Sequence, residues 1–168
     1  MANAVSGAVG KQVSFERERG VQNITVTPDI AHVVISLGSE GKRTEGAMNI
    51  FRSFADANIP IFLIKLHRNA VSFAFEGADF ERSEACLKTI GFEYALRRDL
   101  ARILIMASSI RDLTGVMVRI ADALQQAGAR LYGVGDSHNS VQCLINGSRA
   151  DAAVQQLSST FGLEEARG

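Results

Sequence analysis

The sequence predicts an α+β fold built from two copies of one strand–helix–strand–strand–helix–strand unit. The first observation is an internal repeat. A shift of 70 positions lays residues 22–38 on residues 92–108 without a gap and brings Asp29 onto Asp99. The second observation is that each copy shows the same succession of strand-like and helix-like apolar patterns. A repeat of this length indicates two similar structural units.

Each copy opens with a short β-branched apolar run, residues 32–37 and 102–107, which is typical of a buried strand. After a polar loop, apolar side chains recur at intervals of three and four, which predicts one buried helix face. The members of this stripe are Ala47, Ile50, Phe54 and Ala57 in the first copy, and Met117, Ile120, Leu124 and Ala127 in the second. Asn58 and Gly128 follow, where a helix end often needs a left-handed residue.

The remainder of each copy predicts a hairpin and a second helix. Residues 59–66 and 129–136 predict strands, and residues 70–77 and 140–147 predict their hairpin partners. The second helix follows Gly77 and Gly147, and Ser148 with Asp151 matches a capping box. This order of elements predicts a ferredoxin-like βαββαβ sandwich, with both helices on one face of an antiparallel sheet.

The last strand predicts how the two units are connected. The first copy continues after its second helix into residues 92–98, but the second copy offers no comparable strand. Residues 22–27 supply the missing strand, because a sheet that lacks one member exposes an unpaired edge. We therefore expect the first unit to be inserted within the second. The predicted division is an N-terminal tail (1–20), a first unit (21–99) and a second unit (100–168), with residues 22–27 completing the second unit.

The charge balance argues against nucleic acid and membrane partners. The 168 residues hold 18 Lys and Arg against 18 Asp and Glu, so the net charge is zero and the pI is about 6.8. A basic footprint for nucleic acid or anionic lipid is therefore missing. No apolar run reaches the roughly 18 residues that a membrane span needs, and no secretory pattern occurs, so we expect a cytoplasmic protein. Cys86 and Cys143 sit among apolar neighbours and are expected to be buried.

The loop before the first helix of the second copy combines an acid, a hydroxyl and a glycine: Asp112, Thr114 and Gly115. The unpaired amides at a helix start attract a carboxylate, an acid attracts an ammonium group, and a glycine gives a ligand access. Such a loop suits a zwitterion, that is, an amino acid. The alternative is structural, with Asp112 and Thr114 capping the helix and Gly115 making the bend.

The same residues carry a family resemblance. The stretch RDLTGVMVRIADALQQAG resembles the loop and helix of the second regulatory ACT unit of aspartate kinase, and the inserted tandem arrangement is similar. The resemblance spans about residues 13–161. It implies an allosteric regulatory protein of aspartate-family amino-acid biosynthesis, which binds lysine or threonine where ACT units pack side by side in a homodimer. It also implies no catalytic activity of its own and no cofactor, with a kinase catalytic subunit as a partner.

By position, the resemblance nominates effector-binding residues in both units. In the second unit these are Asp112, Thr114, Gly115, Val116, Gly128, Ala129, Leu131, Ser137 and His138. In the first unit the corresponding places are Thr44, Glu45, Gly46, Asn58, Ile59, Ile61, His67 and Arg68. Two departures from the family pattern matter. Lys42 stands where the second unit has Asp112, which reverses the charge, and Thr114 replaces a proline.

Two alternatives from other classes stay open. One is a ligand-free structural or dimerisation module that regulates another protein. The other is an RNA-binding tandem domain, because RRM domains share the βαββαβ order and Phe73 and Phe75 fall on one strand face. No catalytic constellation is recognisable, the stretch GSEGKRT is too short for a P-loop, and His32, His67 and His138 lack metal-ligand neighbours. We therefore expect no catalytic residue and no metal.

Overall fold

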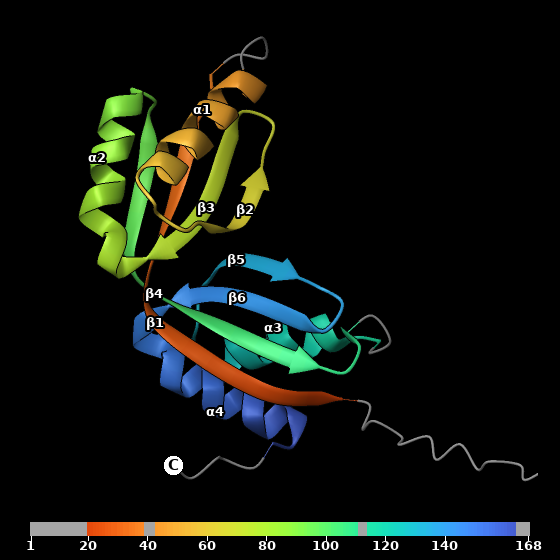
Figure 1. The fold of residues 1–168 in the computed structure, drawn as a ribbon. Coiled ribbons are helices and arrows are strands. Elements are labelled where there is room, and N and C mark those ends of the chain that lie inside the picture. The colour runs from red at the N-terminus through yellow and green to blue at the C-terminus, as the bar shows by residue number, and fades with distance from the viewer. Residues whose placement is uncertain (1–19, 39–42, 111–113, 164–168) are drawn as a thin grey trace, which may run out of the picture.

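The computed structural model of the protein describes residues 20–38, 43–110 and 114–163. Two short 3-10 helices, η2 (Gly77–Asp79) and η4 (Gly147–Arg149), lead into longer α-helices. The other elements, in chain order, are β1 (Val21–Ser36), α1 (Arg43–Asp56), β2 (Phe62–Leu66), β3 (Ala70–Glu76), α2 (Phe80–Ile90), β4 (Tyr94–Ala107), α3 (Val116–Gln126), β5 (Leu131–Asp136), β6 (Ser140–Asn146) and α4 (Ala150–Phe161). Figure 1 shows two similar bodies, one with α1 and α2 and the other with α3 and α4.

The strands form one six-stranded antiparallel sheet in the order β2-β3-β1-β4-β6-β5. The long strands β1 and β4 run through both units and pair with each other twice. Ile35 of β1 pairs with Tyr94 in the first unit, and Ile24 pairs with Ile105 in the second. The first half of β1 thus supplies the outer strand of the second unit. The predicted α+β fold of two ferredoxin-like units, with the first inserted within the second, is confirmed.

Both long strands bend at an aspartate. Asp29 and Asp99 have φ angles of 54° and 58°, a left-handed conformation that interrupts the strand alternation. Ile30 and Ala31 are consequently both buried, although neighbouring strand residues normally face opposite sides. An aspartate between two apolar runs is typical of a turn, but both strands continue through these positions. The strands continue because β1 and β4 pair with each other on both sides of the bend.

Two glycines pack against these bends. A Cβ atom at Gly77 would lie 2.0 Å from Oδ1 of Asp29, and one at Gly147 would lie 2.8 Å from the carbonyl oxygen of Asp99. Neither place accepts a side chain without a shift. In both copies the aligned aspartate and glycine are therefore close in space, through the side chain of Asp29 in the first and through the backbone of Asp99 in the second.

The start of α4 differs from the sequence prediction. The helix begins at Ala150, and its N-cap residue Arg149 makes no side-chain capping hydrogen bond. Ser148 lies within η4, where its hydroxyl accepts a hydrogen bond from Nδ2 of Asn146 at 3.3 Å. The predicted capping box of Ser148 and Asp151 is therefore wrong, because a 3-10 turn occupies the place of the cap.

Each unit has its own core between its helices and the sheet. In the first unit, Phe73 and Phe75 are fully buried beneath α1, and the Phe73 ring meets the Phe54 ring edge-on with centroids 4.9 Å apart. These rings cannot stack on bases, which removes the platform that the RNA-binding alternative requires. In the second unit Cys143 is fully buried, and burial raises the pKa of its thiol to about 12, so it serves as a small apolar side chain.

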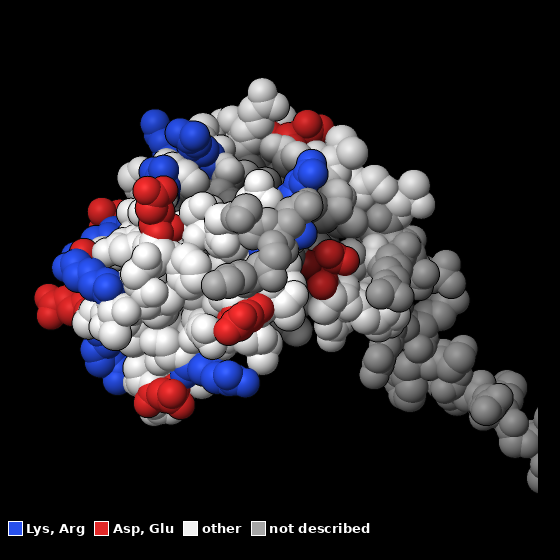
Figure 2. All heavy atoms as spheres, turned by 90° about the horizontal axis from the view of Figure 1, so that it is seen from above, with Lys and Arg blue, Asp and Glu red and all other residues white. Residues whose placement is uncertain are grey.

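The surface carries charges of both signs. Lysine, arginine and acidic side chains are interspersed over the face seen in Figure 2, without a large patch of one sign. Among the described residues, no helix is long and apolar enough to cross a membrane, and no group of three His, Cys, Asp or Glu residues is placed to hold a metal ion.

Candidate functional site

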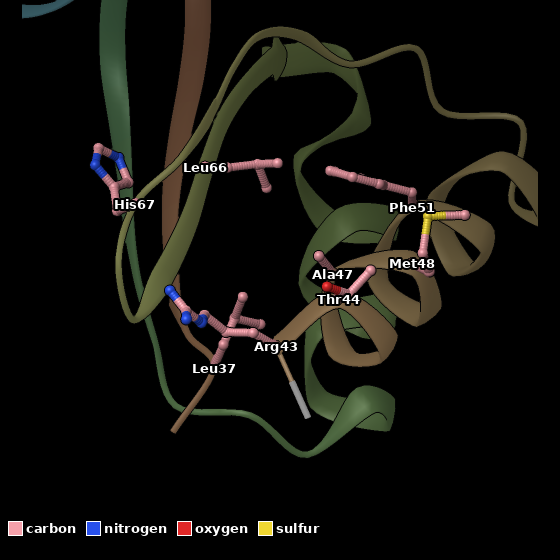
Figure 3. Close-up of a pocket in the computed structure, with 8 residues that line it drawn as sticks. All are labelled: Leu37, Arg43, Thr44, Ala47, Met48, Phe51, Leu66 and His67. Carbon is pink, nitrogen blue, oxygen red and sulfur yellow. The ribbon is translucent and has the colours of Figure 1, made fainter. Parts of the chain in front are cut away.

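A pocket of about 270 Å³ lies in the first unit, beside the start of α1 and the end of β2. Figure 3 shows the side chains that line it: Leu37, Arg43, Thr44, Ala47, Met48, Phe51, Leu66 and His67. The pocket is on the helix side of the sheet, at the edge that β2 forms. It is thus formed mainly by α1, which follows the polar loop of the first repeat copy, and by β2, which precedes the hairpin turn.

Most of the pocket wall is apolar. Met48 and Phe51 of α1 form one side, and Leu66 of β2 forms the other. Met48 is 45% exposed and Leu66 is 70% exposed. They remain exposed because β2 is an edge strand, with no neighbour beyond it in the sheet. The pocket therefore opens onto an apolar edge of the first unit.

Arg43, the first residue of α1, supplies the positive charge of the pocket. Its Nη1 group donates a hydrogen bond to the carbonyl oxygen of Arg68. Its Nε atom is buried and has no hydrogen-bond partner among the described residues. A buried donor without a partner is unfavourable, and a carboxylate is the acceptor that a guanidinium binds best. The positive end of the α1 dipole lies at the same place.

Thr44 and His67 are the two predicted first-unit residues that line this pocket. Thr44 is exposed in the first turn of α1. The imidazole of His67 is turned away from the other labelled side chains in Figure 3. Its Nε2 atom lies 3.0 Å from the hydroxyl of Ser72, which is 4% exposed. His67 therefore borders the pocket without directing its ring into it.

Four other predicted first-unit residues do not line this pocket: Gly46, Asn58, Ile59 and Ile61. A Cβ atom at Gly46 would be 3.2 Å from the Phe92 ring, so this glycine lets α1 approach the core. Asn58 has a φ of 53° and ends α1, and the N–H of Ile59 bonds to the carbonyl of Phe54 at 2.9 Å. Ile61 packs against the same core. Asn58, Ile59 and Ile61 lie beyond the C-terminal end of α1, and a helix of 14 residues separates its ends by about 20 Å.

In the second unit, the predicted loop residues lie at the start of α3, and Asp112 falls outside the described residues. Gly115 has a φ of 75° and occupies the N-cap position, so the N-cap residue offers no side-chain acceptor. Thr114 is exposed, whereas Val116 is 5% exposed and belongs to the core. The side chain of Val116 is therefore not available to a ligand.

The turn after β5 is hydrogen-bonded to Ile110, the last described residue before this loop. The carbonyl of His138 accepts a hydrogen bond from the N–H of Ile110 at 2.9 Å. The hydroxyl of Ser137 lies 2.8 Å from that of Ser140, which holds the turn closed. The remaining predicted residues, Gly128, Ala129 and Leu131, follow the other end of α3, about 16 Å away along a helix of 11 residues.

Sequence reasoning missed Arg43, Met48, Phe51 and Leu66 as pocket residues. Met48 and Leu66 interrupt polar or solvent-facing positions of α1 and β2, and large apolar side chains at such positions are the available signal. No sequence signal marks Arg43, because its role depends on the position of its Nε atom.

No protein-family model matches the sequence. Among curated proteins, aspartokinase 1 of Bacillus subtilis is 23% identical over 162 residues, which are 95% of this chain and 38% of that protein. An aspartokinase of Geobacillus stearothermophilus is 25% identical over an alignment of 171 positions, which covers 98% of this chain and 42% of that protein. The chain thus spans about two fifths of the length of the curated relatives it matches.

Among solved structures, the ligand-free regulatory subunit of aspartate kinase from Thermus thermophilus superimposes with a TM-score of 0.77 at 18% identity, covering 85% of this chain and 99% of that subunit. The chain resembles the tandem ACT-domain regulatory region of aspartate kinase. Aspartokinase III of E. coli in complex with lysine and aspartate, a longer chain, matches this ACT region over 33% of its length with a TM-score of 0.66 and 18% identity. The match to the ACT region thus establishes the fold. The identity of a ligand has to be inferred from the residues that line the pocket.

Proposed function

We propose that this chain is an allosteric regulatory module of the aspartate kinase type, which binds a small amino acid and carries no catalytic residues. The observation that carries the proposal is the pocket beside α1, where the buried Nε of Arg43 has no partner among the described residues. The carboxylate of an amino acid would satisfy this donor. The match to a regulatory subunit over 99% of its length supports a regulatory role.

The pocket walls favour one kind of effector. Among the described residues, the lining includes Arg43, Thr44 and His67 but no carboxylate, and the remaining lining side chains are apolar. A second positive charge on the ligand would find no partner among these residues. Of the two effectors that the resemblance implies, threonine therefore suits the first-unit pocket better than lysine. The second unit, whose loop contains Asp112, is the better candidate for lysine.

The apolar edge beside the pocket supports a homodimer. Met48, Ile64 and Leu66 are 45%, 47% and 70% exposed and lie on neighbouring elements, α1 and β2. A second copy packed against this edge would cover these side chains and close the open side of the pocket. Effector binding would then favour one arrangement of the dimer, which is how a bound amino acid would control a kinase catalytic partner. A cytoplasmic location belongs to the same proposal.

Calorimetric titration of the protein with each proteinogenic amino acid tests the proposal. We expect threonine or lysine to bind with a dissociation constant in the micromolar to low millimolar range, about 4 to 8 kcal/mol, and the others to bind much more weakly. Circular dichroism on the same samples confirms that the protein is folded. If a folded protein binds none of them, the amino-acid sensor is excluded and the ligand-free dimerisation module takes its place.

A further inference from the structure

A second and larger cleft, of about 400 Å³, lies on the opposite face of the sheet. Ala31, Val33 and Ile35 of β1 face the helix-side core, so His32 and Val34 between them face away from the helices. The first unit lines the cleft with His32, Val34, Leu63, Lys65, His67, Ala70 and Ser72, and the second unit with Tyr132, Gly133 and Leu144. The cleft therefore lies between the two units and differs from the pocket beside α1.

The two copies of the repeat differ at several positions that line the cleft. Arg102 and Phe62 stack with the guanidinium carbon 4.6 Å from the ring centroid. The shift of 70 residues that defines the repeat places His32 at the position of Arg102, and Tyr132 at that of Phe62. Histidine is shorter than arginine, so His32 leaves space that a longer side chain would occupy, and Arg97 rather than His32 lies over the Tyr132 ring, at 4.7 Å. The absence of a side chain at Gly133 widens the cleft.

The groups that face the cleft are basic or neutral. His32, Lys65 and His67 line it, and Arg97 pairs with His32 across the β1–β4 ladder and lies over the Tyr132 ring at 4.7 Å. None of the described residues that line the cleft carries a carboxylate. Burial lowers the pKa of His32, and the nearby Arg97 and His67 lower it further because they disfavour a second positive charge.

Side chains of both units form the apolar part of the cleft. The Tyr132 ring, Val34, Leu63 and Leu144 provide its hydrophobic wall. The hydroxyl of Ser72 is buried and lies 3.0 Å from Nε2 of His67, which places a polar group at the base of the first-unit side. A volume of about 400 Å³ falls in the range of small-molecule sites.

We propose that this inter-unit cleft binds a small organic acid, a carboxylate attached to an apolar or aromatic body. Its carboxylate lies among Lys65, His32 and His67, and its body lies against the Tyr132 ring and Leu144. This cleft and the pocket beside α1 lie on opposite faces of the sheet and share only His67 among their described lining residues, so the proposal does not rest on the amino-acid effector. Since both units line the cleft, an occupant also holds the two units together.

Titration with benzoate, followed by NMR of the histidine and tyrosine side chains, tests this site. Benzamide has the same shape without the charge, and inorganic phosphate has the charge without the ring. We expect saturable shifts of the His32 and Tyr132 signals with benzoate only. Equal binding of benzamide would overturn the ionic part of the proposal, and equal binding of phosphate would overturn the organic part.

Three variants locate the binding site. Lys65→Met should weaken benzoate binding about tenfold, as the loss of one charged partner does. Lys88→Met, an exposed lysine on α2 that pairs with Glu84 at 3.3 Å, is the matched control and should leave benzoate binding unchanged. His32→Arg should abolish binding, because the longer side chain would fill the cleft. Benzoate binding that survives both Lys65→Met and His32→Arg, in variants that remain folded, would overturn the proposal.

Discussion

At the scale of single residues, the guanidinium of Arg43 is the group on which the amino-acid proposal depends. Arg43→Met keeps an unbranched apolar stem and removes the charge and the donors of the side chain. We expect threonine or lysine binding to weaken by about 1.5 to 3 kcal/mol, or roughly 10- to 100-fold, because a charge-assisted hydrogen bond is lost. Calorimetry at a single pH measures the change.

Arg52→Met is the matched control for this experiment. Arg52 also lies on α1, is exposed, and does not line the pocket. The Arg52→Met variant should bind the amino acid with the same affinity as the unmodified protein. An equal loss of affinity in both variants would mean that the overall charge of the helix, rather than a contact of Arg43, attracts the ligand.

The sequence identifies buried residues more reliably than binding residues. Cys143, Phe73 and Phe75 are buried as their apolar surroundings indicate. Gly46 and Val116 were nominated as ligand contacts, but they pack in the cores, because a residue beside a loop can face inward as easily as outward. The unpartnered Nε of Arg43 depends on its orientation in the folded chain, which a one-dimensional pattern does not contain.

At the scale of elements, the junction of β6 with η4 is held by a close backbone contact. A Cβ atom at Gly147 would lie 2.8 Å from the carbonyl oxygen of Asp99. Backbone atoms in a paired strand cannot move aside easily, so Gly147→Ala should destabilise the protein by about 1 to 3 kcal/mol. Gly133→Ala is the control, since its Cβ would meet Leu144 at an ordinary 3.8 Å. Urea unfolding should separate the two variants, and equal stabilities would contradict the contact.

The exposed edge of β2 leads to a second prediction at the scale of elements. If Leu66 is covered by a second copy, Leu66→Lys places a charge in an apolar interface and should raise the dimer dissociation constant about tenfold or more. Light scattering across a range of concentrations measures the mass. Arg52→Lys is the control on the neighbouring helix. A protein that is already monomeric before the substitution would contradict the proposed homodimer.

The order and type of the elements can be predicted from the sequence. The sequence does not predict that β1 and β4 each continue through a bend as one long strand. The spacing of apolar residues indicates the helices of each unit, and the repeat indicates that residues 22–27 serve the second unit. The bends at Asp29 and Asp99 appear in the sequence as strand ends, because an aspartate between two apolar runs is typical of a turn. Only pairing between distant segments of β1 and β4 distinguishes a bent strand from two separate strands.

At the scale of the whole molecule, the two units meet across the helix-free face of the curled sheet. A Cβ atom at Gly135 of β5 would lie 2.7 Å from Cδ2 of Leu63 of β2, so the two edge strands come together there. Tyr132 adds a contact between the units, because Arg97 of the first unit lies over its ring at 4.7 Å. A change of charge at this junction acts on the arrangement of both units.

His32 makes this junction sensitive to pH. In the folded protein its pKa lies below the ordinary value of 6.5, first because of burial and then because of Arg97 and His67. The unfolded chain therefore binds a proton more readily than the folded chain at pH values between the two pKa values. The contribution of His32 to stability is complete above about pH 6.5 and is lost as the pH falls towards the folded-state pKa.

We therefore expect the free energy of unfolding to fall more steeply between about pH 7 and pH 5 in the unmodified protein than in His32→Gln, which cannot gain a proton. Urea unfolding in chloride buffer, without organic acids, measures this difference while the cleft holds no carboxylate ligand. His138→Gln, at an exposed turn of the second unit, is the matched control and should keep the steep pH dependence. If His32→Gln and the unmodified protein lose stability in parallel, protonation of His32 does not act on the junction. The acid sensitivity would then arise from groups outside the cleft.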